Sequence, residues 1–338
     1  MLDMTKAKVT ILDIARMAGV SKATVSRYLN GHYEKMSAQT KEKIKQVIAD
    51  SHYHVNRQAQ SITKKQTFII GIIVADIENI FSSMLFKGAD QVFENVHYQI
   101  MLMNSDNSQQ RERQQLERLL DLRVDGIILQ PISQHAEDYQ FLADTHVPTV
   151  IVDRKLTPER WPAVVTDNYQ YSKMLMDYIL RLGYQRIVVV SEPVAANFPR
   201  QDRYRAVQDT CQRQSVPTSL IEIQPATTDD ELYRQLLQVT HDLQDKAAIY
   251  ALKGTLLMRI VRILARYQIA VPSEMGVAAF DDWDWATLTS PQITTIQQNP
   301  KVMGQQAAER LLEVLAGKEP PMLTSVESEF VVRQSLTK

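Results

Sequence analysis

From residue 68 onward, short apolar runs alternate with longer stretches in which apolar residues recur at helical spacing. The apolar runs are 68–75, 99–104, 126–129, 147–152, 186–190, 220–223, 247–251 and 275–280. The helical patterns between them are 81–95, 109–120, 203–213, 230–241 and 255–266. Short strands separated by amphipathic helices predict an α/β fold, with parallel sheets covered by helices on both faces.

These strands are too many for one comfortable sheet. We therefore predict a core at 68–338 made of two interleaved Rossmann-like subdomains, at about 68–166 and 167–297. The expected crossover lies near 166–168. Late elements at 293–296, 301–315 and 330–332 can cross back between the halves.

The N-terminal segment Val9–Asn30, VTILDIARMAGVSKATVSRYLN, has a different pattern. Thr10 can cap a helix at 11–18, with Asp13 placed for a capping box, and Gly19 can end it. Ser21 can cap a second helix at 22–29. A third helix follows Ser37. We predict an all-α helix-turn-helix headpiece at 1–55 and a polar hinge or linker at 56–67 that is helical only under some conditions.

The charge of the chain is divided unevenly. Residues 1–65 hold 12 Lys or Arg and 5 Asp or Glu, while the whole chain has a net charge of -1. This basic segment indicates a nucleic-acid or membrane contact, or alternatively a merely solvated surface. With no apolar run of 18 residues and no visible secretory signal, we expect a cytoplasmic protein without a membrane partner.

Within the helix-turn-helix, Val25 and Leu29 should bury the second helix against the first. Four residues then face outward where a recognition helix meets base edges, namely Lys22, Ala23, Ser26 and Arg27. Arg27 can bind guanine bidentately. The side chains that can donate to phosphates are Thr10, Ser21, Thr24 and Ser26. The alternative is a helical hairpin that serves only as structure.

Polar residues also follow the predicted strands of the core. In open parallel sheets, ligands bind beyond the carboxyl ends of the strands. Here these positions hold Asp76, Gln130, Asp153, Arg154, Glu192, Lys253 and Asp281, and Arg200 and Arg203 lie near the start of the following helix. The alternative is that strand ends are polar in any case.

Six segments in the same order resemble the LacI/GalR family of transcriptional repressors. They are VTILDIARMAGVSKATVSRYLNG, SAQTKEKIKQVI, NRQAQSI, VDGIIL at 124–129, VTDN at 165–168 and AFDD at 279–282. The resemblance covers nearly the whole chain. It implies a periplasmic-binding-protein-like core, a homodimer on a near-palindromic double-stranded operator, and a small-molecule effector in the cleft between the two halves.

The resemblance also implies roles for single residues. Lys22, Ala23 and Arg27 stand where the family reads bases, and Asn56, Ala59 and Ile62 stand in a hinge helix that enters the minor groove. Recurring effector contacts fall on Asp76, Phe81, Asp153, Arg203 and Asp281. In these positions Phe81 would pack on the ligand, and Asp153 and Asp281 would accept hydrogen bonds from hydroxyl groups.

Several positions depart from the family pattern. Ile62 stands where the family usually has Leu, Val55 replaces a common Pro, and the loop 31–36 is about one residue longer than usual. Leu252-Lys253 replaces an Asn-Asp pair of many relatives. The stretch EKMSAQTKEKI resembles the branch that regulates catabolism of 2-keto-3-deoxygluconate and related sugar acids.

The cations near the cleft bear on the effector. The cleft has more positive charges than binding of a neutral sugar requires, from Arg154, Arg200, Arg203 and Lys253. Guanidinium groups bind carboxylates or phosphates through paired hydrogen bonds. Together with the sugar-acid resemblance, they favour a sugar acid, with a phosphorylated sugar second and a neutral sugar as the alternative. Against this, Arg200 can instead pair with Asp202 or Glu192 and never meet the ligand.

The sequence therefore predicts a non-enzymatic DNA-binding regulator, a repressor of carbohydrate catabolism. A sugar-binding transport protein or an α/β enzyme acting on sugars would share the core fold, but no GxGxxG, GxxxxGK[ST] or GxSxG motif occurs. We expect no cofactor. A metal site is not expected at His52 and His54, which lack a nearby carboxylate cluster. Cys211 should be a small buried apolar residue, and Trp283 and Trp285 could line a sugar site or belong to the core.

Overall fold

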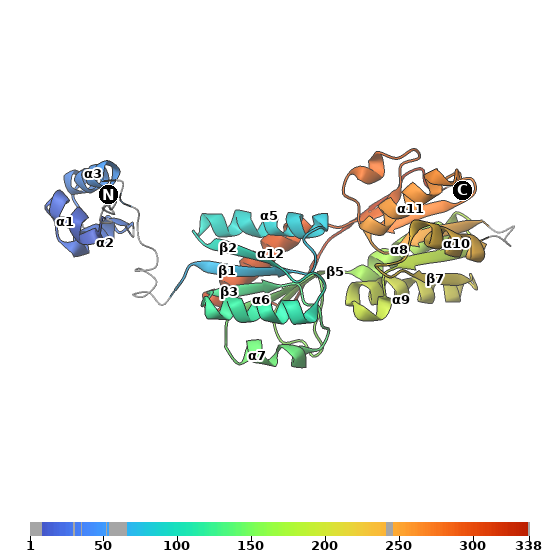
Figure 1. The fold of residues 1–338 in the computed structure, drawn as a ribbon, viewed down its shortest axis with the longest axis horizontal. Coiled ribbons are helices and arrows are strands. Elements are labelled where there is room, and N and C mark those ends of the chain that lie inside the picture. The colour runs from blue at the N-terminus through green and yellow to red at the C-terminus, as the bar shows by residue number, and fades with distance from the viewer. Residues whose placement is uncertain are drawn as a thin grey trace, which may run out of the picture. The chain divides into compact units, whose positions relative to one another are not determined.

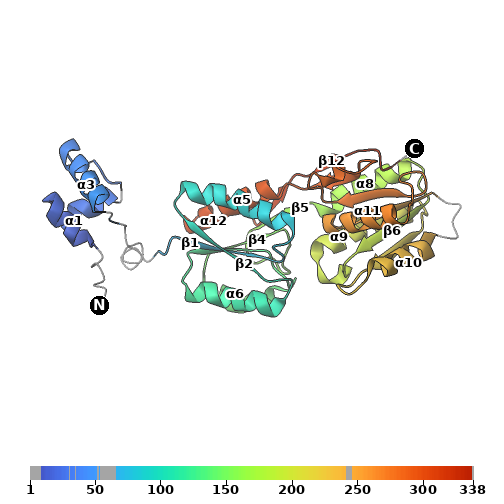
Figure 2. The same cartoon turned by 45° about the horizontal axis from the view of Figure 1, so that its top comes forward.

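The computed structural model describes residues 9–29, 31–34, 36–51, 53, 66–240 and 246–336. The chain divides into two compact units, Met1–Thr67 and Phe68–Lys338, and Figures 1 and 2 show their folds. Each unit is described by itself below. None of the described helices is long and apolar enough to cross a membrane.

The N-terminal unit contains the three predicted helices, α1 (Ile11–Ala18), α2 (Lys22–Leu29) and α3 (Ala38–Asp50). The predicted capping box is present, since Thr10 and Asp13 each accept from the other's backbone amide. Gly19 follows α1 with φ 64°, a left-handed conformation that favours glycine. The apolar core of this unit is small and closes the three helices on one another: Ile14, Ala15, Ala18, Val25 and Ile44.

The second unit contains two six-stranded sheets. The first has the order β11-β5-β4-β3-β1-β2 and is parallel throughout. Its strands are β1 (Ile69–Val74), β2 (Gln99–Asn104), β3 (Gly126–Leu129), β4 (Thr149–Val152), β5 (Ala163–Thr166) and β11 (Leu323–Val326). The two predicted helices flank it as α5 (Ile80–Asn95) and α6 (Gln109–Asp121), with the short η1 (Ala136–Tyr139) and α7 (Gln140–Ala143).

The second sheet has the order β12-β10-β9-β8-β6-β7, and only its edge strand β12 runs antiparallel. Its strands are β6 (Arg186–Ser191), β7 (Thr218–Glu222), β8 (Ala247–Ala251), β9 (Gly276–Phe280), β10 (Thr294–Gln297) and β12 (Glu329–Val331). The main helices are α8 (Asn168–Arg181), α9 (Phe198–Arg213), α10 (Asp229–Thr240) and α11 (Gly254–Arg266), with short turns η2 (Val194–Ala196) and η3 (Trp285–Thr287). Apolar clusters place α10 and α11 on one face and α8 and α9 on the other.

The chain passes between the two sheets three times. It leaves the first sheet after β5, returns through α12 (Pro300–Leu315) and β11, and crosses again to β12. Both views in Figures 1 and 2 show α12 beside α5, far apart in sequence. The approach is close because Gly88 and Gly304 face the partner helix. A Cβ on Gly88 would lie 1.9 Å from the carbonyl oxygen of Lys301.

Candidate functional site

The outward face of α2 carries an exposed patch that includes two cations. Lys22, Ala23 and Arg27 are exposed, while Ser26 and Thr24 are half-buried and Val25 is fully buried. Among the described residues, neither the Lys22 ammonium nor the Arg27 guanidinium has a hydrogen-bond or ion-pair partner. Both cations are therefore available to a ligand, and Ala23 between them leaves room for a base edge to approach.

Hydroxyl groups lie at the N-terminal ends of α1 and α2. The Thr24 amide donates to Ser21 Oγ at 3.1 Å, so Ser21 caps α2 as predicted. The two hydroxyls, Ser21 Oγ and Thr24 Oγ1, are 2.9 Å apart. Thr10 Oγ1 donates to Asp13 at 2.6 Å. Hydroxyls and backbone amides at helix N-termini form suitable contacts for phosphate groups.

Three of the predicted DNA contacts, Asn56, Ala59 and Ile62, lie outside the described residues. The same holds for His52 and His54, and for Val55. No group of three or more His, Cys, Asp or Glu that could hold a metal occurs in the part of the chain that the structure describes.

One cavity lies in the second unit between the carboxyl ends of the strands of both sheets. Its walls contain nine residues that the sequence analysis selected, namely Asp76, Phe81, Gln130, Asp153, Arg154, Arg200, Arg203, Lys253 and Asp281. Glu192, which was also selected at a strand end, is not among the lining residues. The sequence analysis missed six further polar or ring residues of the lining: Asn79, Ser82, Asn107, Asn197, Pro199 and Gln298. Asn79 and Asn197 cap the helices that follow β1 and β6, so their cap positions were the available signal.

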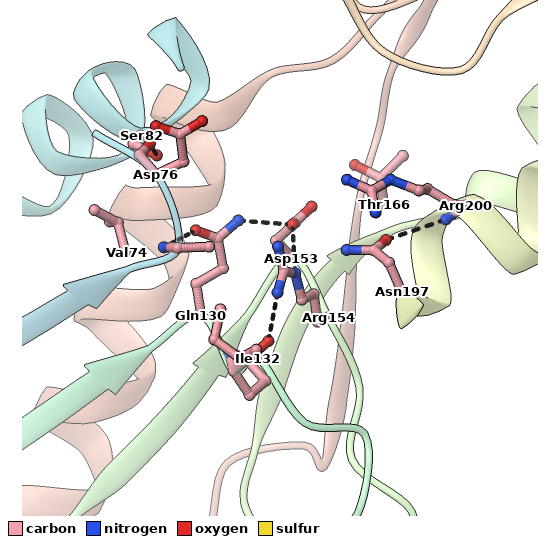
Figure 3. Close-up of polar contacts among 12 residues, drawn as sticks. Val74, Asp76, Ser82, Gln130, Ile132, Asp153, Arg154, Thr166, Asn197 and Arg200 are labelled. Carbon is pink, nitrogen blue, oxygen red and sulfur yellow. Dashed lines mark hydrogen bonds and ion pairs between the residues drawn. The ribbon is translucent and has the colours of Figure 1, made fainter. Parts of the chain in front are cut away.

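The first-half wall is held by a chain of hydrogen bonds (Figure 3). The Ala75 amide donates to Gln130 Oε1 at 2.8 Å, and Gln130 Nε2 donates to Asp153 Oδ2 at 2.8 Å. Arg154 Nη1 donates to the Pro131 carbonyl at 2.8 Å. Gln130 thus ties the ends of β1 and β4 together and fixes the direction of the Asp153 carboxylate.

Two aspartates occupy equivalent places in the two halves. Asp153 follows β4 and Asp281 follows β9, and each of these strands is fourth in its sheet counted from the β2 or β7 edge. Both have a left-handed backbone, with φ 65° and 80°. Aspartate tolerates this conformation better than most residues. The repeated geometry gives the cavity two carboxylates that can accept hydrogen bonds from hydroxyl groups.

The second-half wall is centred on Arg203, which is 5% exposed. Its guanidinium lies 3.6 Å from the Phe280 ring centroid, and it donates to Asn168 Oδ1 at 2.8 Å and to the Leu252 carbonyl at 2.6 Å. Asp281 accepts from Gln298. Burial raises the pKa of Asp281, although Arg203 and Gln298 favour its charged form.

The remaining three cations of the lining are Arg154, Arg200 and Lys253. Arg200 pairs with Glu192, as one alternative had it, yet it also lines the cavity. Lys253 Nζ lies 3.2 Å from Glu192 Oε1, and Arg154 Nε lies 3.8 Å from Asp153 Oδ2 without a hydrogen-bond partner. Burial, together with Arg154 and Arg203, lowers the pKa of Arg200 to about 10. An anionic ligand would relieve this repulsion.

The other candidates belong to the core. Trp283 is 9% exposed and packs edge-on against Phe81, with ring centroids 6.3 Å apart, and it does not line the cavity. Trp285 packs against the same cluster. Cys211 is fully buried on α9, as predicted, and burial raises the pKa of its thiol to about 11.

Comparisons with known families agree with both parts of this geometry. The family described as "Bacterial regulatory proteins, lacI family" matches residues 10–56, and "Periplasmic binding protein-like domain" matches residues 176–336. The chain is 34% identical to the HTH-type transcriptional regulator KdgR of Bacillus subtilis, over 98% of this chain and 99% of the relative. It is 31% identical to the HTH-type transcriptional regulator PtxS of Pseudomonas plecoglossicida, over 99% and 97%.

Solved structures show the same fold. A LacI transcriptional regulator from Lactobacillus brevis is 29% identical, with a TM-score of 0.72, and covers 78% of this chain and 100% of that chain. The lac repressor dimer bound to operator and the anti-inducer ONPF is 20% identical, with a TM-score of 0.84 over 98% of this chain and 100% of that chain. This second similarity concerns the fold of the headpiece and of the two-sheet core.

Proposed function

Because this chain belongs to the LacI family of bacterial transcriptional regulators, we propose that it represses genes of carbohydrate catabolism and that a sugar acid controls it. Members of this family bind DNA and small-molecule effectors and are not enzymes. The finer proposal has three parts: a homodimer binds a near-palindromic operator, the outward face of α2 reads its bases, and the cavity of the core binds the effector. It follows that the protein acts in the cytoplasm, where the DNA is.

The DNA-reading part is supported by two cations on α2 that have no hydrogen-bond or ion-pair partner among the described residues. Lys22 and Arg27 flank Ala23 on one exposed helix face, as base readout in the major groove requires. Thr10, Ser21, Thr24 and Ser26 would donate to phosphates and fix the headpiece on the duplex. Asn56, Ala59 and Ile62 would act in the minor groove. Two-fold symmetry of a palindrome asks for a dimer, which light scattering would report.

The effector part is carried by one observation: four cations and three carboxylates meet in a single cavity between the two sheets. The cations would bind the acid group of the effector, because guanidinium forks match a carboxylate with two parallel hydrogen bonds. Asp76, Asp153 and Asp281 would accept from its hydroxyl groups, and Phe81 would pack on its apolar face. Gln130 would hold Asp153 in place.

Control of DNA binding would follow from the position of the cavity. A ligand that contacts Asp153 on one side and Arg200 or Asp281 on the other favours one arrangement of the two halves over others. If that arrangement separates the headpieces of the dimer, effector and operator weaken each other by the same factor. The effector is then an inducer.

Calorimetry tests the effector class. We expect 2-keto-3-deoxygluconate or a related sugar acid to bind more tightly than a neutral sugar of the same size, with a phosphorylated sugar second. Tight binding of a neutral sugar, with sugar acids silent, would overturn the sugar-acid proposal. Binding to promoter DNA that falls steeply with salt would separate a DNA-binding regulator from a sugar-transport protein or an enzyme of the same core fold.

A further inference from the structure

Glu192 follows β6 and contacts two of the four cations, yet it lies just outside the residues that line the cavity. One carboxylate oxygen pairs with Arg200, and the other lies 3.2 Å from Lys253 Nζ. The side chains of Arg200 and Lys253 are 16% and 17% exposed, and that of Glu192 is 32% exposed. A single carboxylate of the protein therefore pairs with two of the cations that an anionic ligand would bind.

The other carboxylates of the cavity have partners of their own. Asp153 accepts from Gln130 and lies near Arg154, and Asp281 accepts from Gln298 and faces Arg203. Asp76 accepts from the Glu78 amide at 3.0 Å. Without Glu192, Arg200 and Lys253 would be two nearby positive charges in a poorly hydrated place. Burial and Arg200 already lower the pKa of Lys253, although the more distant Asp76 and Asp281 favour its charged form. Glu192 thus compensates charge that no other described side chain pairs with at hydrogen-bond distance.

The contacts with Glu192 can be exchanged without dismantling the site. Arg200 has a separate hold on the protein, because its Nη1 donates to the Pro193 carbonyl at 3.3 Å and its amide donates to Asn197 Oδ1 at 3.2 Å. Glu192 is also the most solvent-exposed of the three side chains. When displaced, its carboxylate can therefore regain hydration more easily than either cation could.

We propose that Glu192 is an internal competitor for the anionic group of the effector. It pairs with Arg200 and Lys253 while the cavity is empty and gives way when a carboxylate or phosphate binds there. This inference rests on the proposed effector class. Glu192 would then set the affinity for anionic ligands, and a neutral sugar, which cannot replace an anion between two cations, would leave Glu192 in place.

The direct test is E192Q, which keeps the size of the side chain and removes its charge. We expect it to bind the sugar acid about three- to tenfold more tightly than wild type, because the partly exposed ion pairs of Glu192 with Arg200 and Lys253 no longer have to be broken. Affinity for a neutral sugar should change by less than about twofold. D202N is the matched control: Asp202 is also a carboxylate on this side of the fold, but it pairs with the exposed Arg205 at 2.8 Å and does not line the cavity.

A second variant and a second ligand distinguish failure of this inference from failure of the sugar-acid proposal. E192D retains the charge and should stay near wild type, and inorganic phosphate, at matched ionic strength, should raise the Tm of E192Q more than that of wild type or D202N. Weaker or unchanged anion binding by E192Q would make Glu192 a mere holder of Arg200 and overturn the inference. If phosphate behaves as expected but sugar acids bind neither protein, the internal competitor stands and the sugar-acid proposal fails.

Discussion

We expect base recognition to depend most on Arg27. Its guanidinium is exposed on α2 and has no partner among the described residues. R27A should weaken binding to a selected operator by about 1–3 kcal/mol and weaken binding to random DNA less. The operator loses both a base contact and one positive charge, whereas random DNA loses only the charge. Fluorescence anisotropy with both DNAs measures this. K45A, on α3, is the control, since Lys45 pairs with Glu42. Equal losses on both DNAs would make Arg27 only a phosphate contact.

Glu112 is a buried carboxyl on α6 that the sequence analysis did not select. Tyr139 Oη donates to it at 2.6 Å and the Ile132 amide donates at 2.8 Å, and it is 1% exposed. Burial raises its pKa to about 7, against the effect of these two donors and of Arg154. The folded protein therefore holds a proton on Glu112 that the unfolded chain releases above its ordinary pKa.

The raised pKa of Glu112 makes the free energy of unfolding depend on pH. Between about pH 4.5 and pH 7, unfolded chains release the Glu112 proton first, so the free energy of unfolding falls as pH rises, by on the order of 3 kcal/mol in all. E112Q should flatten this part of the profile, because the amide can accept from Ile132 and donate to Tyr139 without titrating. Urea unfolding from pH 5 to pH 8 compares the two proteins. Identical slopes would show that Glu112 is ionised throughout.

Sequence reasoning found the cavity residues that follow strands and missed those that depend on distant partners. Asp76, Gln130 and Asp153 stand directly after apolar runs, so their place at the sheet edge could be predicted. Gln298, which was not selected, lies in the cavity wall and donates a hydrogen bond to Asp281. Glu192 was selected at the end of β6 and as a possible partner of Arg200, but its contact with Lys253, 61 residues away, was not predicted. No local pattern reports such contacts.

At the scale of elements, the helices with strong local signals were the predictable ones. The ranges of α1 and α2 were predicted to the residue because Thr10, Gly19 and Ser21 mark their ends. α9 begins at Phe198, five residues before the predicted range, since Asn197 caps it and Pro199 fits its first turn. The four-residue β5 and β11 were missed: β11 is an edge strand with a half-exposed pattern, and its partner β5 is far away in sequence.

The crossing of α5 and α12 gives a prediction about stability. G88A should lower the free energy of unfolding by more than about 2 kcal/mol, because its methyl group would meet backbone of α12 rather than a movable side chain. K87A, at an exposed position of the same helix, should change it by less than about 0.5 kcal/mol. Denaturant unfolding of G88A, K87A and the wild type measures these changes in the free energy of unfolding. Near-equal stabilities would mean that the two helices can separate at little cost.

Residues 56–64 of the hinge give another prediction at this scale, although they lie outside the described residues. A short polar segment forms a marginal helix alone, so we expect it to order when two copies pack on DNA with Ile62 as an apolar wedge in the minor groove. I62A should weaken operator binding and leave effector affinity of the free protein and dimerisation unchanged. Operator titration, calorimetry and light scattering check these three properties. Normal operator binding with normal release by effector would contradict the wedge.

At the scale of the whole molecule, the two halves of the core contact each other around the charged cavity. Phe81 lines the cavity from α5 in the first half and packs against Trp283, which follows β9 of the second half. Gln134 Nε2 of the first half donates to the Ala195 carbonyl of the second at 3.1 Å. We expect a ligand between the halves to change such contacts, which would provide a physical basis for coupling the effector to DNA.

An anionic ligand in this cavity and operator DNA should be coupled through one protein. The most direct measurement titrates a selected operator with and without saturating 2-keto-3-deoxygluconate, and then titrates the sugar acid with and without operator. We predict that both affinities fall by the same factor, about 5- to 150-fold, as linkage requires. An equal rise in both would keep the coupling and make the ligand a corepressor. Operator affinity that is the same with and without the bound sugar acid would show that the cavity and the DNA-binding headpiece are not coupled.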